Sequence, residues 1–166
     1  MYNIGDTVLH PTAGVCKITD IKSENFASLG LKEFYVLSPI YDKGQIIHSP
    51  VDSEKIQLRK VLDEEEIYTL IHSISRSEPL WTDNDAMRKD IFMKTLKSGK
   101  HTKIIQLIIE ICEKREEKIK SGKKLHMADE RILNEAEKII HQEFAYALNI
   151  EPNAVAQFIM KELGII

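Results

Sequence analysis

Trp81 is the only tryptophan of the 166-residue chain, and its placement suggests a contact with another molecule. The ring comes just after Pro79, where the backbone is extended. The polar residues 82–84 can cap a helix that we expect over 85–96. Two interpretations are open. Trp is usually well buried, so the ring could fill a core, or it could be an apolar wedge that inserts between unstacked bases.

Cations near this residue would suit the second interpretation, because phosphates bind Lys and Arg. Arg88 and Lys89 follow within two turns of the expected helix, and lysines surround a second short loop at Ser121-Gly122. Exposed lysines are common, so solvated surfaces remain the alternative for both groups. The candidate DNA-binding residues are Trp81, Arg88, Lys89, Lys120, Lys123 and Lys124.

No arrangement typical of catalysis is present. The sequence has no phosphate loop, dinucleotide fingerprint or paired-histidine metal motif, and its six histidines are scattered. Cys16 and Cys112 lie far apart, with no cation placed to lower either pKa. We therefore expect no enzyme, no metal, no cofactor and no small-molecule substrate.

The overall charge limits the kind of nucleic-acid contact. The net charge is −3, with 43% hydrophobic and 30% charged residues, which is typical of a globular chain that is not strongly basic. No apolar run approaches the ~18 residues of a membrane span. The first residues lack the features of a signal peptide. Two cysteines without metal spacing favour reduced thiols, and we expect a cytoplasmic protein with no membrane contact.

These residues are positioned by a chain that we expect to form two domains, because the period of its hydrophobic residues changes from 2 to 3.6 near residue 63. The fold class is α+β, with domains at 1–62 and 63–166. Five short strands with tight turns predict a small bent barrel, together with a loop over 23–30 and a helical turn over 52–55. The expected strands are 7–9, 15–21, 33–37, 45–48 and 56–60.

The second domain is predicted to be all-α with five helices. Apolar residues surround the third helix almost completely, so we expect it at the centre of the bundle. Met87, Ile91, Phe92 and Leu96 are the expected core positions of the second helix, and Gly99 its left-handed cap. The expected helices cover about 63–75, 85–96, 102–118, 128–148 and 152–163.

Read together, these segments resemble the CarD/CdnL family of bacterial transcription regulators over almost the whole chain. Each motif is weak alone, but their order and spacing make the combination specific. The motifs are Ile4-Gly5-Asp6-Thr7-Val8, His10-Pro11-x-x-Gly14-Val15, Glu33-Phe34-Tyr35-Val36-Leu37, Ile47-His48-Ser49-Pro50-Val51, Leu58-Arg59, Trp81, Leu96-Lys97-Ser98-Gly99, Leu125 and Asp129-Glu130-Arg131-Ile132-Leu133-x-x-Ala136.

The resemblance implies a Tudor-like N-terminal barrel, shared with transcription-repair coupling factor, that binds the β-subunit lobe of RNA polymerase. It also implies a helical domain that reaches the upstream edge of the promoter bubble. There a tryptophan, here Trp81, would wedge into the minor groove and hold the opened DNA, largely without reading sequence. The RNA polymerase-binding candidates are Lys22, Ile46, Ile47, His48, Pro50 and Arg59.

The chain also departs from the pattern of its relatives. His48 stands where members often carry arginine, and Glu130 where some have lysine. Asp83 and Asp85 occupy positions where cations facing DNA would be expected. These acids favour an alternative function, a non-catalytic protein–protein adaptor on RNA polymerase that never contacts DNA.

Overall fold

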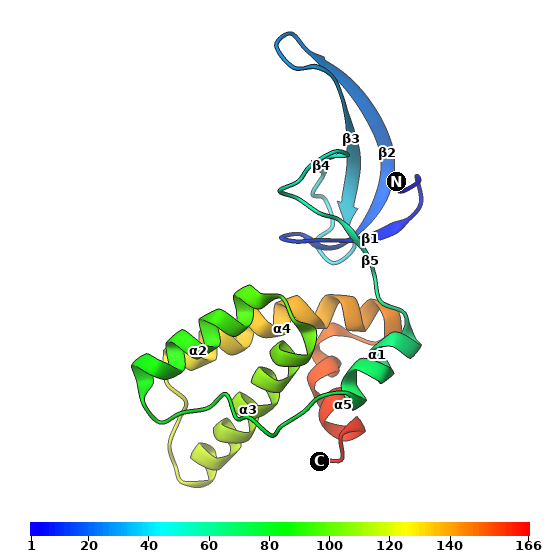
Figure 1. Ribbon diagram of the computed structural model, residues 1–166. Coiled ribbons are helices and arrows are strands. Elements are labelled where there is room, and N and C mark those ends of the chain that lie inside the picture. Colours follow the sequence, from blue (N-terminus) through cyan, green and yellow to red (C-terminus); the bar gives the residue numbers. More distant parts are fainter. The chain divides into compact units, whose positions relative to one another are not determined.

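The computed structural model describes residues 1–166 and divides into two compact units. The β unit comprises Met1–Leu62 and the helical unit comprises Asp63–Ile166. The β unit contains only strands and turns, and the helical unit contains five α-helices and a short 3-10 helix (Figure 1). The α+β class is therefore confirmed.

The β unit is one antiparallel sheet with the strand order β4-β3-β2-β1-β5. Its strands are β1 (Thr7–His10), β2 (Gly14–Phe26), β3 (Gly30–Pro39), β4 (Ile47–Pro50) and β5 (Arg59–Lys60). The five predicted strands are present. However, β4 pairs only with β3 and β5 only with β1, so the ladder is open and a closed barrel is not confirmed.

The long β2–β3 hairpin corrects the predicted loop over 23–30. The two strands pair from Cys16 opposite Pro39 to Phe26 opposite Gly30. Gly30 has a φ of 73°, which suits the tight turn at the tip. The outer part of the hairpin is exposed on both faces. It therefore lacks the alternating pattern that identifies a half-buried strand in a sequence.

Three other predictions for the β unit were wrong in detail. The strand expected over 45–48 begins at Ile47, and the strand expected over 56–60 contains only Arg59–Lys60. Residues 52–55 form turns and bends rather than a helical turn. Short segments with few apolar residues give little periodic signal, so their boundaries are the least predictable.

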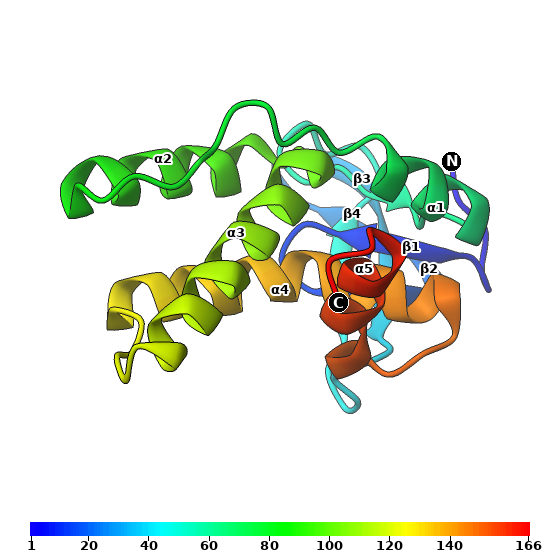
Figure 2. The same ribbon diagram turned by 90° about the horizontal axis from the view of Figure 1, so that it is seen from below.

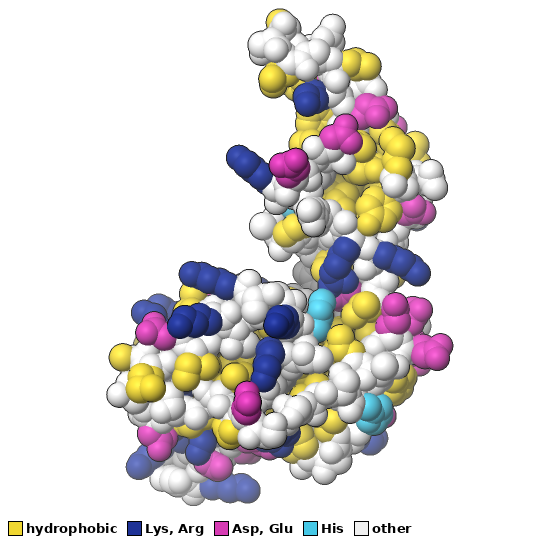
Figure 3. All heavy atoms as spheres, viewed as in Figure 1, with side chains coloured by type: hydrophobic (Ala, Val, Ile, Leu, Met, Phe, Trp, Pro, Cys, Tyr) yellow, Lys and Arg dark blue, Asp and Glu magenta, His cyan; other side chains and the backbone are white.

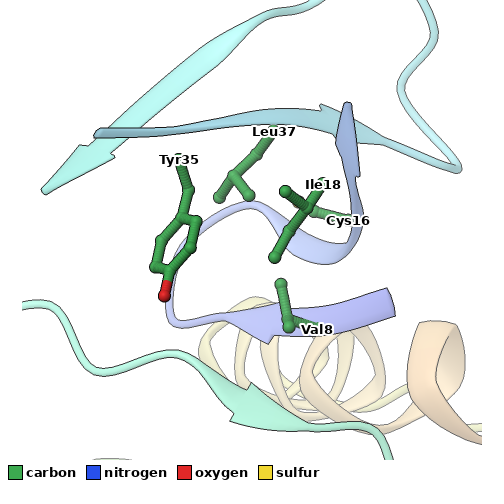
Figure 4. Close-up of a cluster of buried hydrophobic side chains, with 5 residues drawn as sticks. All are labelled: Val8, Cys16, Ile18, Tyr35 and Leu37. Carbon is green, nitrogen blue, oxygen red and sulfur yellow. The ribbon is translucent and has the colours of Figure 1, made fainter. Parts of the chain in front are cut away.

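The core of the β unit is a small cluster contributed by three neighbouring strands. It consists of the buried side chains Val8, Cys16, Ile18, Tyr35 and Leu37 (Figure 4). Tyr2 closes one side of the cluster, because its hydroxyl donates to the carbonyl of Leu58 (3.1 Å) and its amide donates to the Tyr35 hydroxyl (3.0 Å). The N-terminal residues are thereby fixed against the sheet.

His10 organises the β1–β2 turn. Its Nδ1 accepts hydrogen bonds from the backbone amides of Thr12 (3.2 Å) and Ala13 (3.1 Å), and its side chain is buried. An Nδ1 that accepts two N–H groups cannot carry a proton, so this arrangement requires the neutral imidazole. Burial also lowers the pKa of His10.

The helical unit packs α-helices around α3. Its helices are α1 (Glu64–His72), α2 (Asp85–Ser98), α3 (His101–Lys120), α4 (Met127–Leu148), the 3-10 helix η1 (Pro152–Ala154) and α5 (Val155–Glu162). Every side chain from Ile104 to Cys112 is buried, which confirms α3 as the central helix. None of these helices combines the length and apolar composition of a membrane span.

Local capping determines where α1 and α2 begin and end. A capping box between Asp63 and Glu66 starts α1, which ends at His72, three residues before the predicted end. The Asn84 side chain caps α2 by accepting from the amide of Met87. Gly99 has a φ of 64° and forms the predicted left-handed cap.

The core face of α2 differs from the prediction at Met87, whose side chain is 56% exposed. Arg88 and Thr95 are buried on this helix together with Phe92. Hydrophobic periodicity predicts Met87 as the buried residue where the structure buries Arg88, because an Arg counts as a polar, exposed position in such a pattern.

Each unit contains one of the two thiols. Cys16 is buried in the β unit and Cys112 is buried on α3, and neither forms a disulfide. Burial raises the pKa of Cys16 to about 11 and also raises the pKa of Cys112. Both thiols are therefore protonated at neutral pH, as expected of packing residues.

We predict that the β unit loses stability in mild acid through His10. The pKa of this side chain is lower in the folded state than the ~6.5 of an unfolded His. The contribution of neutral His10 to the free energy of unfolding is therefore complete above pH ~6.5, and it is lost as the pH falls through the folded pKa. Hydrogen exchange of the Val8 amide, corrected for intrinsic rates, should show this decrease between pH 7 and pH 5. A His10→Asn variant should flatten the pH dependence, and an unchanged dependence would contradict the assignment.

Candidate nucleic-acid interface

The Trp81 loop, residues 73–84, connects α1 to α2 and is held against α3 by Glu110. One carboxylate oxygen of Glu110 accepts hydrogen bonds from the backbone amides of Leu80 and Trp81, both at 2.8 Å. Glu110 is only 7% exposed. A buried carboxylate that accepts two amides fixes the backbone at the point where the indole branches from it.

Gln106 completes this attachment one turn earlier on α3. Its side-chain amide donates to the second carboxylate oxygen of Glu110 and to the carbonyl of Glu78, both at 2.8 Å. The loop is therefore fixed at three backbone positions, those of residues 78, 80 and 81. The polar pair Gln106 and Glu110 satisfies the hydrogen-bonding groups that this loop buries.

The indole of Trp81 is partly exposed rather than enclosed in a core. Its ring lies 6.0 Å from that of Phe92, centroid to centroid. The guanidinium carbon of Arg88 lies 4.5 Å from the ring centroid, and Nζ of Lys114 lies 5.7 Å from it. The indole N–H donates to Asp83 at 3.2 Å. These contacts hold the ring in one orientation while leaving part of it accessible.

Arg88 is the residue that joins the ring to the helices. It is 4% exposed, and its Nε and Nη2 form a two-pronged interaction with Asp129 of α4 at 3.0 and 2.9 Å. Its Nη1 donates to the carbonyl of Thr82 at 3.0 Å, and Nη2 also donates to Asp85 at 2.8 Å. Every part of the guanidinium is therefore occupied, and Arg88 supports Trp81 instead of facing solvent.

The charges in this network stabilise one another. The hydrogen bonds that Arg88 donates to Asp129 raise the pKa of Arg88, and the hydrogen bond that it donates to Asp85 lowers the pKa of Asp85. Asp83 and Asp85, which depart from the family pattern, thus contact Trp81 and Arg88 directly. Both acids therefore hold groups of this site in place, Asp83 the indole of Trp81 and Asp85 the guanidinium of Arg88.

A small cavity of about 180 Å³ adjoins the Trp81 ring. Three acidic residues of α3 line it, together with Arg76, which pairs with Glu113, and Lys114, which pairs with Glu117 at 3.0 Å. No three His, Cys, Asp or Glu side chains converge as metal ligands would.

The predicted lysines lie at the same end of the helical unit as the start of α2. Figures 1 and 2 both show the start of α2, the end of α3 and the start of α4 together at this end. His126, just before α4, lies 3.8 Å from Asp85. The lysines at 89, 120, 123 and 124 are exposed and form no ion pair. The structure thus gathers them near the start of α2, and their contact with DNA stays a prediction.

The polymerase-binding candidates are distributed over three strands of the β unit. Ile47, His48 and Pro50 lie on the edge strand β4, and the exposed Ile46 directly precedes it. Arg59 lies on β5, at the opposite edge of the sheet. The exposed Lys22 lies on β2, opposite Phe34, which pairs in turn with Pro50. Only the residues on and beside β4 form a continuous group.

Several residues of this site were missed by the sequence reasoning. Gln106 and Glu110 carried a usable signal, since they are two polar residues four apart within an otherwise apolar run. Asp129 stood in one of the motifs of the resemblance but with no role, and Lys114 was not among the candidate residues. Neither has a local pattern that identifies its partner.

Comparison with known protein families identifies the β unit. Residues 2–62 match the family model described as the CarD-like/TRCF RID domain. No curated protein matches the chain. The chain therefore carries a CarD-like RNA-polymerase-interacting domain, which indicates a transcription-related role that involves RNA polymerase. The match does not extend over the helical unit.

We predict opposite outcomes for two adjacent cations on α2. Arg88→Met leaves the buried Asp129 carboxylate without its partner, so it should lower the free energy of unfolding of the helical unit by about 3–5 kcal/mol. Lys89→Met removes an exposed side chain and should change it by less than about 0.5 kcal/mol. Urea denaturation monitored by Trp81 fluorescence measures both. Equal effects would show that Arg88 is not the structural cation described above.

Glu110 gives a second prediction, because its charge holds the Trp81 loop. Glu110→Gln keeps the size of the side chain but weakens two hydrogen bonds to a charged acceptor, at a cost of about 2 kcal/mol. The loop should also become more mobile, seen as a lower fluorescence anisotropy of Trp81. Glu116→Gln, at an exposed position of α3 that forms no ion pair, is the matched control. An unchanged anisotropy in Glu110→Gln would contradict this role.

Proposed function

We propose that this protein is a non-catalytic transcription regulator. Its β unit binds the β subunit of RNA polymerase, and its helical unit stabilises the open promoter complex by inserting Trp81 into the minor groove. The RNA-polymerase-interacting domain at residues 2–62 supports the first part. The geometry around Trp81 supports the second.

The observation that carries the DNA contact is the fixed, partly exposed indole. Its backbone is held by Glu110, and Arg88 contacts its ring. A ring that is already oriented loses little conformational entropy when it binds. Wedging between base steps has to offset an unstacking cost of a few kcal/mol, so prior orientation favours insertion.

Such a wedge acts on DNA shape and needs little sequence readout. The net charge of −3 would give weak affinity for free DNA. Attachment to polymerase compensates for this weakness, because it raises the effective concentration of the helical unit at the promoter. The proposed target is therefore promoter DNA within the polymerase complex.

The proposed polymerase contact centres on β4. This strand is a short edge of the open sheet, and an edge presents unpaired backbone groups to a partner. Two accessible side chains lie at this edge. They are His48 on β4 and Ile46 directly before the strand, which is 69% exposed. Lys22 and Arg59 would contribute only if the partner covers more of the sheet.

One specific observation favours the alternative, an adaptor on polymerase that does not contact DNA. The cavity beside Trp81 is lined by Glu110, Glu113 and Glu117. Carboxylates repel phosphates, so a duplex approaching from that side would be disfavoured. A basic or neutral protein surface would fit the same side of the ring.

A promoter-opening assay with purified polymerase tests the proposal. Trp81→Ala should shorten the lifetime that the protein confers on the open complex by about tenfold, as expected from losing roughly 1–2 kcal/mol of base stacking. Binding to the polymerase β lobe should be unchanged, since the substitution lies outside the β unit.

Tyr146→Ala is the control, because it removes another aromatic of the helical unit that is 42% exposed. It should leave the lifetime unaltered. If Trp81→Ala stabilises the open complex as well as the parent protein does, the wedge is wrong. In that case the adaptor function is favoured.

A further inference from the structure

A cavity of about 420 Å³ opens in the β unit, and the proposed contacts leave it unassigned. Its wall is formed by the N-terminal residues, β3, the end of β4 and residues 51–58, which lead to β5. The cavity is thus bounded by the segment that connects the two edges of the open sheet. Ligand pockets in proteins measure about 300–1,000 Å³, so this one is large enough for a partner's side chain.

Two tyrosines form an aromatic wall of this cavity. The rings of Tyr2 and Tyr35 meet edge to face, with centroids 6.1 Å apart and an angle of 65° between their planes. The Tyr2 hydroxyl donates to the carbonyl of Leu58, and the Tyr35 hydroxyl accepts from the amide of Tyr2. Tyr35 stands at one side of the core cluster in Figure 4. The wall is therefore held in place before a ligand enters.

Two carboxylates lie at the rim of the cavity. Glu33 comes two residues before Tyr35 on β3, and side chains two apart share one face of a strand. Asp52 lies in the segment after β4. Both side chains are exposed, and neither forms an ion pair or a side-chain hydrogen bond. No Lys, Arg or His side chain lines the cavity, so its negative charge is not compensated there.

A basic side chain fits this combination of walls and charges. Figure 3 shows Asp and Glu side chains beside hydrophobic ones on the visible face of the β unit. Two carboxylates would repel an anion, and a purely apolar group would desolvate them without a compensating interaction. The stem of a Lys or Arg can pack against the apolar wall while its charged end meets the carboxylates. The faces of tyrosine rings also attract cations.

The cavity begins where the free edge of β4 stops offering backbone donors. The Val51 amide donates to the carbonyl of Glu33 at 3.0 Å, so residues 49 and 51 direct their backbone groups toward β3. Those of His48 and Pro50 consequently face outward. Proline has no N–H, so the pairing of a partner strand weakens at Pro50, which itself lines the cavity. A strand paired with β4 would therefore reach the cavity at the end of its pairing.

From this arrangement we infer that the cavity accepts one Lys or Arg side chain of the RNA polymerase segment that pairs with β4. The inference rests on the proposed function, because it takes the polymerase contact at β4 as given. Backbone pairing at a strand edge supplies affinity, whereas a pocket for a side chain supplies specificity. The cavity thus selects a segment that carries a basic residue just beyond its paired residues.

The experiment measures binding of the full chain to RNA polymerase core enzyme by biolayer interferometry. Glu33→Gln/Asp52→Asn keeps the shape of the cavity but removes its charge. It should weaken binding about tenfold, mostly through faster dissociation, because it leaves the partner's cation unpaired. Thermal melting should match that of the parent, since neither carboxylate forms an ion pair or a hydrogen bond in the free protein.

The matched control is Glu116→Gln/Glu135→Gln, which removes the same charge from exposed positions on α3 and α4 of the helical unit. This variant should bind polymerase like the parent. Ile46→Asp, at the exposed residue beside β4, tests the edge contact separately and should weaken binding independently of the cavity.

Carbodiimide coupling of the complex identifies the partner residue, since it joins a carboxylate to a lysine amine in contact with it. A link from Glu33 or Asp52 to a lysine of the β subunit, found by peptide mass mapping, would assign a lysine. Weaker binding of Glu33→Gln/Asp52→Asn without such a link would assign an arginine, which carbodiimide does not couple.

The outcomes separate this inference from the proposed function. If Ile46→Asp weakens binding but the cavity variant binds like the parent, the contact at β4 stands and the inference is overturned. It is also overturned if the cavity variant and the helical control weaken binding equally, because the effect would then be one of net charge. If the parent does not bind the core enzyme, the proposed function itself fails, and the inference fails with it.

Discussion

The buried interaction between Arg88 and Asp129 is the constraint on which the Trp81 site depends. One guanidinium binds a carboxylate of α4, the carbonyl of Thr82 and the face of the indole. It thereby joins a loop and two helices whose positions would otherwise be set only by apolar packing, which is not directional. Together with Glu110 it turns a flexible connection into a site with one geometry. The same placement sets the rotation of α2, and so decides which of its residues face solvent.

Much of the fold could be predicted because its elements obey local rules. Helix α4 follows the 3.6-residue period, and Gly99 ends α2 in the left-handed conformation that the sequence predicts. The apolar run of α3 identified the centre of the helical unit. The hairpin beyond Ser23 escaped prediction because its residues bury neither face, so backbone pairing alone defines it. The pairing of edge strands is also non-local, and no local pattern indicates whether a sheet closes.

The candidate site was only half predictable for a related reason. Arg88 and Lys89 are neighbours in the sequence and look equivalent there, yet one is 4% exposed and the other faces solvent. The difference lies in Asp129, forty-one residues away, which the sequence does not connect to Arg88. Likewise Asp83 and Asp85 read as obstacles to a DNA contact. In the structure they orient the indole and hold the guanidinium.

The distribution of the two thiols has a practical consequence. Cys16 and Cys112 are the only cysteines, they lie in different units, and both are buried. An alkylating reagent can reach either sulfur only when the unit around it opens. Peptide mass mapping of the alkylated sites would then measure the opening rate of each unit separately, without any engineered label. The native chain is therefore suited to asking which half opens first when it leaves its partner.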